Sequence, residues 1–219
     1  FAQNAYTSFE EPAVFTIEYT DTGDPSAAHD LLNNTNEPNV DYTFTGGELG
    51  FNARYEPYDT PGDGLSDGDF VGVTEDAPSI PFPDGLQGYL ISDADGNFIV
   101  EFDPVLISSP LIQIDYFISE TGYEGDGTVN TSGSDRLRIY VKNLDDNMEY
   151  DLLDTTGNDI NDLNIEGVWN TVNVAIENSP DITVKLIIEA RNNAGTEAFF
   201  FDNISFTGTL GLSDVKDNL

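Results

Sequence analysis

Residues 111–117 of this chain are Leu-Ile-Gln-Ile-Asp-Tyr-Phe, and this alternation of apolar and polar side chains decides the fold class. Successive side chains of a β-strand point to opposite faces of the sheet, so a two-residue period is typical of a strand with one buried face. The same period predicts half-buried strands over residues 14–19, 137–141, 171–176, 182–187 and 198–206. We therefore expect an all-β protein.

Turn signals separate these segments. Asp-Gly pairs favour the positive φ angles of tight turns, and they occur at residues 63–64, 67–68, 84–85, 95–96 and 126–127. Residues 91–99 carry the clearest hairpin pattern, and only residues 159–166 show a short helical one. About twelve strands with frequent turns predict a β-sandwich, with a jelly roll as the expected topology. We expect one domain over residues 1–207 and a polar tail over 208–219.

Charge narrows the possible partners. The 219 residues include 41 Asp and Glu against 7 Lys and Arg, which gives a formal net charge of -34. Nucleic acid and anionic membrane surfaces bind through Lys and Arg, so we exclude both as partners. Ca²⁺, which prefers oxygen ligands, would be attracted. The chain has no Cys, hence no disulfide and no Cys-based zinc site, and no apolar run long enough to predict membrane insertion.

Signatures of catalysis are scarce. His29 is the single histidine, with no cysteine to activate and no serine elbow in the sequence, so a nucleophile–His–Asp site is not expected. Residues 101–104, Glu-Phe-Asp-Pro, begin like the Glu-x-Asp-x-x-Glu strand of jelly-roll glucanases, but the proline breaks the pattern. We expect that the protein is not an enzyme.

The two chain ends carry the most informative motif. Residues 8–12 are Ser-Phe-Glu-Glu-Pro, and residues 201–204 are Phe-Asp-Asn-Ile. This pair resembles calcium-dependent jelly-roll carbohydrate-binding modules and MAM-type ectodomains. The resemblance implies that Glu10 and Asp202 bind a structural Ca²⁺ where the first and last strands pair, with Glu11 as a weaker substitute. Asp24, in the loop of residues 21–24, is a further candidate ligand that the family pattern does not fix. The alternative is that these acids only cap strand ends and contact water.

Two other acidic segments bear on metal binding. The first is ambiguous, and the second does not fit a metal-binding motif. Residues 62–69, Gly-Asp-Gly-Leu-Ser-Asp-Gly-Asp, could surround a second Ca²⁺ or form an acidic loop without one. Asp93, Asp95 and Asn97 begin like an EF-hand loop, but the glycine comes at the fourth position and a strand follows. For that segment we expect a plain hairpin turn.

Sugar binding requires exposed aromatic planes beside polar groups. Tyr55 and Tyr58 alternate with polar residues at the end of a predicted strand, and Tyr123 lies in a loop with Asp126. These four residues are the candidate ligand-binding residues, although the tyrosines could equally be ordinary buried aromatics. Trp169 precedes a strong strand, and we expect it in the core.

Both termini suggest export. Residues 1–5, Phe-Ala-Gln-Asn-Ala, look like the remnant of a signal-peptide cleavage region. Residues 210–219 resemble the connector before the C-terminal sorting domain of type IX-secreted Bacteroidetes proteins, which implies an extracellular or cell-surface location. The leading hypothesis is a secreted, calcium-stabilised module that binds glycan at a cell surface or in the matrix. The alternative is an adhesive or structural protein that binds another protein or its own copies, and a glycan hydrolase or lyase comes third.

Overall fold

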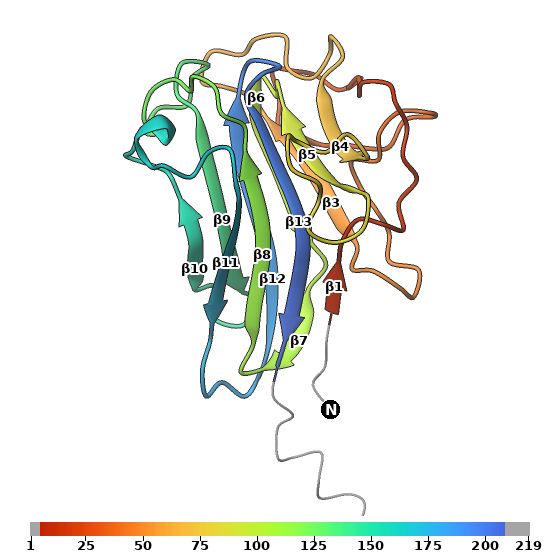
Figure 1. The fold of residues 1–219 in the computed structure, drawn as a ribbon, viewed down its shortest axis with the longest axis vertical. Helices are drawn as coiled ribbons and strands as arrows, with labels where there is room; N and C mark the ends of the chain where they lie inside the picture. Colours follow the sequence, from red (N-terminus) through yellow and green to blue (C-terminus); the bar gives the residue numbers. More distant parts are fainter. Residues whose placement is uncertain (1–4, 209–219) are drawn as a thin grey trace, which may run out of the picture.

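The computed structural model describes residues 5–208 and shows two antiparallel β-sheets packed face to face (Figure 1). The six-stranded sheet contains β1 (Ala5–Thr7), β4 (Phe70–Thr74), β5 (Gly88–Ser92), β8 (Leu111–Ile118), β11 (Trp169–Ala175) and β13 (Ala198–Thr207). The seven-stranded sheet contains β2 (His29–Asp30), β3 (Phe51–Glu56), β6 (Gly96–Phe102), β7 (Val105–Ser108), β9 (Arg136–Asn143), β10 (Glu149–Asp154) and β12 (Asp181–Asn192). The predicted all-β sandwich is confirmed.

Consecutive strands often belong to opposite sheets, as in jelly-roll sandwiches. The strand order is β11-β8-β13-β5-β4 in one sheet, with β1 beside β13, and β10-β9-β12-β6-β3-β2 in the other, with β7 beside β12. The connections β5–β6, β8–β9 and β12–β13 therefore cross between sheets, and all three lie at the upper end of Figure 1. Loops that are distant in sequence meet at this end.

The core lies between the sheets and follows the two-residue period. Ile112 and Ile114 of β8 face it from one sheet, and Ile139 and Val141 of β9 face it from the other. Aromatic side chains fill the region near β1, where Phe9 lies 5.4 Å from Phe51, 5.6 Å from Tyr89 and 6.2 Å from Phe102 between ring centroids. Edge-to-face and tilted contacts of this kind stabilise the core beyond the burial of apolar area.

The strand predicted over residues 14–19 is wrong. Of this segment only Tyr19 pairs, through two hydrogen bonds to Asp69 of 2.8 and 2.9 Å. Phe15 and Ile17 instead line a groove on the outer face of the six-stranded sheet, and Ile17 stays 51% exposed. An alternating pattern shows only that one side of a segment is apolar. Such a segment can pack over a sheet without being one of its strands.

The hairpin predicted over residues 91–99 is also wrong, although the turn itself is present. β5 pairs with β4 and β13, whereas β6 pairs with β3 and β12, so the turn at Asp93–Asp95 passes from one sheet to the other. The short helical pattern near residue 160 forms a single 3₁₀ turn, Ile160–Asp162, capped by the side chain of Asp159. Among the described residues no helix is long and apolar enough to cross a bilayer.

Candidate metal centres and candidate binding face

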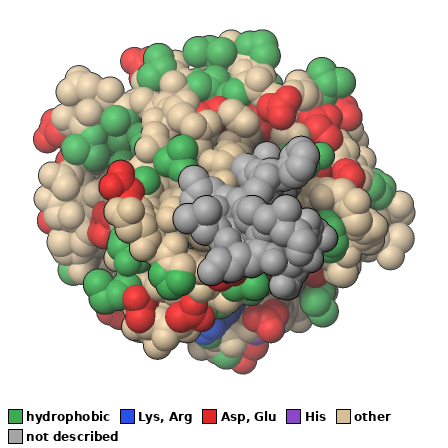
Figure 2. Space-filling model, turned by 90° about the horizontal axis from the view of Figure 1, so that it is seen from below, with side chains coloured by type: hydrophobic (Ala, Val, Ile, Leu, Met, Phe, Trp, Pro, Cys, Tyr) green, Lys and Arg blue, Asp and Glu red, His purple; other side chains and the backbone are tan. Residues whose placement is uncertain are grey.

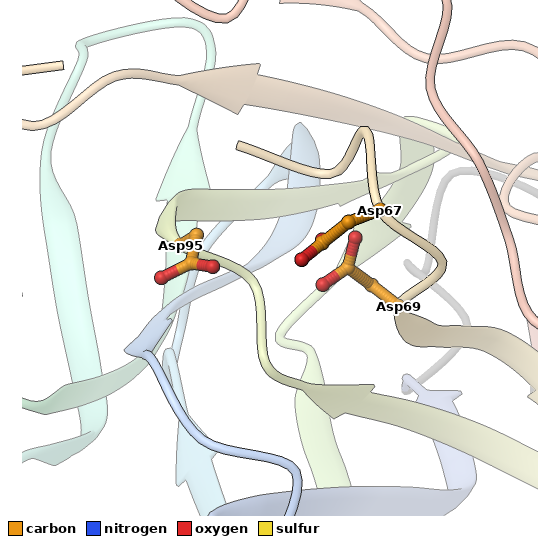
Figure 3. Close-up of side chains that lie close together, drawn as sticks. All are labelled: Asp67, Asp69 and Asp95. Carbon is orange, nitrogen blue, oxygen red and sulfur yellow. The ribbon is translucent and has the colours of Figure 1, made fainter. Parts of the chain in front are cut away.

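Three aspartates converge at the upper end of the sandwich (Figure 3). Asp67 and Asp69 lie in the loop before β4, and Asp95 lies in the turn between β5 and β6. One carboxylate oxygen of each lies within 4.8 Å of the others. We call these three residues the aspartate cluster. Gly68, at φ +101°, makes the local bend between the first two, a conformation that side-chain-bearing residues rarely adopt.

Asp69 is the most buried residue of this cluster, and one of its carboxylate oxygens has no hydrogen-bond partner within the described part of the chain. Asp69 is 1% exposed, and its Oδ2 has no hydrogen-bond partner among residues 5–208. Burial raises the pKa of Asp69 to about 9, and the charges of Asp67 and Asp93 add to the effect. Burial likewise raises the pKa of Asp95 to about 6. A bound cation would offset both effects, and carboxylate oxygens are the ligands that Ca²⁺ prefers.

This geometry shows that residues 62–69 belong to a group of carboxylates that could hold a metal ion. The loop supplies two of the three oxygens, and the third comes from the turn for which the sequence predicted no role in metal binding. Asp95 was missed because its spacing was judged alone, as an EF-hand start. The signal that could have found it is the density of acids in both loops, but only the crossing of β5 to β6 brings them together.

A second group of carboxylates lies at the same end. Glu124, Asp135 and Glu197 each place one oxygen within 4.8 Å of the others, and we call them the glutamate cluster. They are separated by 11 and 62 residues of sequence, so no local motif points to them. In the described part of the chain these are the two groups of three or more such side chains. Asp24 belongs to neither, and its Oδ1 accepts hydrogen bonds from Ser26 in an exposed turn.

The chain-end residues do converge on one loop. β1 pairs with β13, and Glu10 Oε1 accepts hydrogen bonds of 2.7 Å from the backbone of Leu86 and of Gln87. Asp202 is fully buried, and its Oδ2 accepts a 2.8 Å bond from Asp84 N. Burial raises the pKa of Asp202 to about 7.

The side chain of Gln87 makes this loop chemically informative. One terminal atom of its carboxamide lies 2.5 Å from the carbonyl oxygen of Phe9 and 3.2 Å from that of Pro12. The carboxamide nitrogen at this position donates to both carbonyls. The calcium site predicted at Glu10 and Asp202 stays a prediction.

The tyrosines predicted to stack on sugar are buried. Tyr55 is 1%, Tyr58 5% and Tyr123 5% exposed, so none presents a ring face to solvent and this prediction is wrong. The hydroxyl of Tyr55 donates to Asp95 O at 3.0 Å, and the ring of Tyr123 stacks on Phe199 at 5.5 Å. The prediction assumed that a tyrosine near the end of a strand is exposed, and for Tyr55 and Tyr58 this does not hold. Asp126 is exposed, and its Oδ1 accepts bonds from Thr128.

Basic residues gather on one face. Six of the seven Lys and Arg residues lie in the described part, and all six belong to the seven-stranded sheet: Arg54, Arg136, Arg138, Lys142, Lys185 and Arg191. Strand register places them on the outer face, since Lys142 is opposite Lys185, and Arg136 is opposite Arg191. We call this surface the polar face. Figure 2, which views the end near the N-terminus, shows acidic and apolar side chains with basic ones only at one edge.

Carboxylates pair with five of these six cations. The acidic partners are Glu56, Glu101, Glu149, Asp151, Asp154 and Glu189. Because all the Lys and Arg of the described residues gather here, this face is less acidic than the rest of a chain with net charge -34. The sequence does indicate that residues 136, 138 and 142 share one side of a strand, because they alternate with apolar residues. This pattern predicts only a solvated face.

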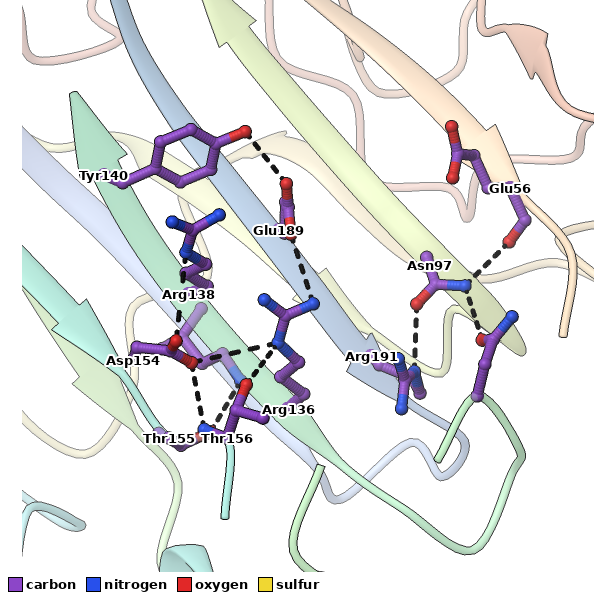
Figure 4. A network of polar contacts seen from close by, with 12 residues as sticks. Glu56, Asn97, Arg136, Arg138, Tyr140, Asp154, Thr155, Thr156, Glu189 and Arg191 are labelled. Atoms are coloured by element: carbon purple, nitrogen blue, oxygen red, sulfur yellow. Dashed lines mark hydrogen bonds and ion pairs between the residues drawn. The ribbon is translucent and has the colours of Figure 1, made fainter. Parts of the chain in front are cut away.

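The polar contacts on this face form two groups, one around Arg136 and Glu189 and one around Arg191 and Asn97 (Figure 4). Glu189 accepts from Tyr140 at 2.9 Å and from Arg136 at 3.2 Å. Arg191 is buried and donates to Asn97 Oδ1 at 2.9 Å and to the carbonyls of Val129 and Ser134. These contacts border a hollow of about 360 Å³, in the size range of small-ligand sites. The hollow thus presents oriented donors and acceptors without a strong net charge.

The outer face of the other sheet is apolar. Phe117 and Phe200 form a cluster there with Phe82, and Trp169 packs against it half-buried. Trp169 thus lies outside the inter-sheet core in which it was expected. A groove of about 390 Å³ runs beside this cluster and is lined in part by Phe70, which is 48% exposed.

No family model and no curated protein matches the chain. Among solved structures, a family 16 carbohydrate-binding module is similar with 13% identity and a TM-score of 0.42, over 64% of this chain and 86% of that one. The Stig cyclase Fisc from Fischerella sp. TAU is similar with 15% identity and a TM-score of 0.37, over 94% and 98%. The K3 adhesin domain of Lys-gingipain from Porphyromonas gingivalis shows 9% identity and a TM-score of 0.36, over 57% and 75%. A fold does not imply a function, so the function must be argued from the site.

Proposed function

We propose that this chain is a calcium-stabilised, non-catalytic binding domain that holds a glycan on the polar face and acts outside the cell. The hollow bordered by Arg136, Glu189 and Asn97 carries the proposal. Its charge balance matters first. The net charge of -34 repels anionic ligands, and the hollow, lined by three Arg and three Glu, has no excess charge that would favour a cation, so an uncharged ligand fits best.

Chemistry favours a ligand rich in hydroxyl groups. Each sugar hydroxyl donates and accepts, and the hollow offers guanidinium donors, carboxylate acceptors and the amide of Asn97. The mutual ion pairs fix these side chains before a ligand arrives, so little conformational entropy is lost on binding. Tyr140 is covered by Arg138, whose Cζ lies 4.0 Å from the ring centroid, so recognition would rest on hydrogen bonds rather than stacking.

Calcium would serve stability in this proposal. The aspartate cluster places a buried, unpartnered Asp69 oxygen beside two further carboxylates. An ion there would fasten the loop before β4 to the turn between β5 and β6. Calcium sites of extracellular modules bind with dissociation constants of about 10⁻⁴–10⁻³ M, which suits a domain working where free Ca²⁺ is abundant.

A matched pair of variants tests the binding face. Arg136→Ala removes a cation that borders the hollow, whereas Lys142→Ala removes one from the same strand outside it. Glycan arrays and affinity electrophoresis should identify a retained neutral glycan, and Arg136→Ala should weaken its binding at least about tenfold, the loss of one charged hydrogen bond. Lys142→Ala should bind as wild type. Equal binding by both variants, or cleavage of the glycan, would contradict the proposal.

One observation favours the second candidate, an adhesive domain. The apolar groove with Phe70 and Ile17 is the kind of surface that self-association covers. Sedimentation velocity in Ca²⁺ would then show concentration-dependent assembly that Phe70→Ser abolishes. A monomer at all concentrations would exclude self-assembly.

A further inference from the structure

The glutamate cluster joins three segments that are remote in sequence. Glu124 lies in the loop between β8 and β9, Asp135 immediately precedes β9, and Glu197 immediately precedes β13. Because β8–β9 and β12–β13 both cross between sheets at the upper end, their loops meet there. The cluster therefore lies where the β8–β9 connection meets the β12–β13 connection.

Hydrogen bonds fix these carboxylates without using all their oxygens. Asp135 Oδ2 accepts from Glu124 N at 2.5 Å, and Glu197 Oε2 accepts from Asn193 N at 2.9 Å. The other oxygen of Asp135, Oδ1, is buried and has no partner among the described residues, and the same holds for the hydroxyl of Ser134. The backbone thus orients the carboxylates and leaves a buried acceptor free for something else.

No Lys, Arg or His among residues 5–208 forms an ion pair with this cluster. Asp135 and Glu197 are each 2% exposed. Arg191 is nearby, but its guanidinium donates to Asn97 and to the carbonyls of Val129 and Ser134. Burial raises the pKa of both Asp135 and Glu197, and repulsion by the charge of Glu124 adds to it. Buried carboxylates in such numbers are normally paired or bound to metal.

We propose that Glu124, Asp135 and Glu197 form a second cation site, which takes a divalent ion with oxygen ligands, Ca²⁺ in the first place. Two buried carboxylates and the exposed Glu124 supply the protein ligands, and water completes the coordination shell of six to eight oxygens. The ion fastens the loop of residues 119–135 to the turn before β13. The same loop carries Asn130, whose Oδ1 accepts from Asn97 at 2.8 Å on the polar face.

Calorimetric titration of metal-free protein with CaCl₂ tests the site directly. Asp135→Asn and Glu197→Gln should each bind one ion fewer than wild type, and Asp69→Asn, in the aspartate cluster, should also lose one. The double variant Asp69→Asn/Asp135→Asn should lose two, which shows that the sites are separate. Glu177→Gln, an exposed acid after β11, is the control and should bind as wild type. Wild-type stoichiometry in both Asp135→Asn and Glu197→Gln would overturn the proposal.

Two further measurements keep the test decisive. If the buried variants do not fold, Glu124→Gln replaces them, since Glu124 is exposed and its loss should still weaken binding of one ion at least tenfold. Hydrogen exchange should show amides 124–135 protected by Ca²⁺ in wild type and in Asp69→Asn, but not in Asp135→Asn. Exchange that Ca²⁺ leaves unchanged in wild type would refute the fastening of this loop. Neither the calorimetric titration nor the hydrogen exchange requires a glycan, so the cation site can fail or succeed independently of the proposed function.

Discussion

Asn192 bridges the two acidic clusters, because its carbonyl oxygen accepts from Asp95 N at 3.1 Å while its side chain donates to the carbonyl of Glu197 at 2.5 Å. Its side chain also accepts from Ala94 N and donates to Ile91 O, each at 3.1 Å. Asn192 is fully buried. The β5–β6 turn and the β12–β13 turn are thus held by one residue at the end of β12.

Replacing this bridge should destabilise the protein. Asn192→Ala removes three side-chain hydrogen bonds and leaves buried backbone groups unpaired, so we expect a loss of about 2–4 kcal/mol in the free energy of unfolding. Urea denaturation followed by circular dichroism measures it. Asn173→Ala, on the exposed side of β11, is the control and should change stability by less than about 0.5 kcal/mol. A comparable loss in both variants would show that Asn192 has no special role.

Asp69→Asn should separate metal binding from folding. The change keeps the shape of the side chain and removes the charge, so the metal-free protein should be at least as stable as wild type. The stabilisation by Ca²⁺ should fall by about 2.7 kcal/mol at an ion concentration a hundredfold above the dissociation constant. Denaturation in CaCl₂ and in EDTA gives both quantities. An undiminished response to Ca²⁺ would exclude the aspartate cluster as a site.

Asp202→Asn tests the chain-end site. We expect this variant to lose part of the stabilisation by Ca²⁺, because Asp202 and Glu10 are the ligands expected there. Gln87→Leu is the comparison and should lower stability equally in CaCl₂ and EDTA, because its carboxamide nitrogen donates to Phe9 O and Pro12 O. A response of Asp202→Asn to Ca²⁺ that equals that of wild type would exclude the chain-end site.

His29 should make a pH-dependent contribution to stability. Partial burial lowers its pKa, but the hydrogen bond to Ala27 O and the 2.7 Å pair with Asp21 outweigh this, and the net pKa is raised above 6.5. The folded state therefore binds the proton more tightly, so the contribution is complete below about pH 6.5 and disappears as the pH rises through the folded pKa.

The corresponding measurement is a difference between proteins. The loss of stability in His29→Gln should be larger at pH 5.5 than at pH 9, and comparison with wild type at each pH cancels the titration of the carboxylates. In the Asp21→Asn background the loss should depend less on pH, because only the hydrogen bond to Ala27 O and the charge of Asp24 still raise the pKa of His29. A loss that is the same at both pH values in the wild-type background would rule out the ion pair.

The fold class could be predicted from the sequence, because burial of one strand face imposes a two-residue period that residues 111–117 and 182–187 display locally. The pairing of the chain ends was also predictable, through motifs at residues 8–12 and 201–204, and β1 does lie beside β13. Exposure was not predictable for Tyr55, Tyr58 and Tyr123, since the same aromatic side chain fills a core or faces solvent depending on what covers it.

Sequence by itself determined the alternation that makes sheets, the glycine-rich turns and the excess of acid that attracts cations. Only the tertiary structure decided which acids meet. Asp95 joins Asp69, and Asp135 joins Glu197, because β5–β6, β8–β9 and β12–β13 cross between the sheets at one end. The same register gathers six cations on one face of β3, β9 and β12. Carboxylate oxygens interact strongly only when they lie within a few ångströms of one another. Which remote residues come that close depends on the order of the strands, and local sequence patterns do not encode that order.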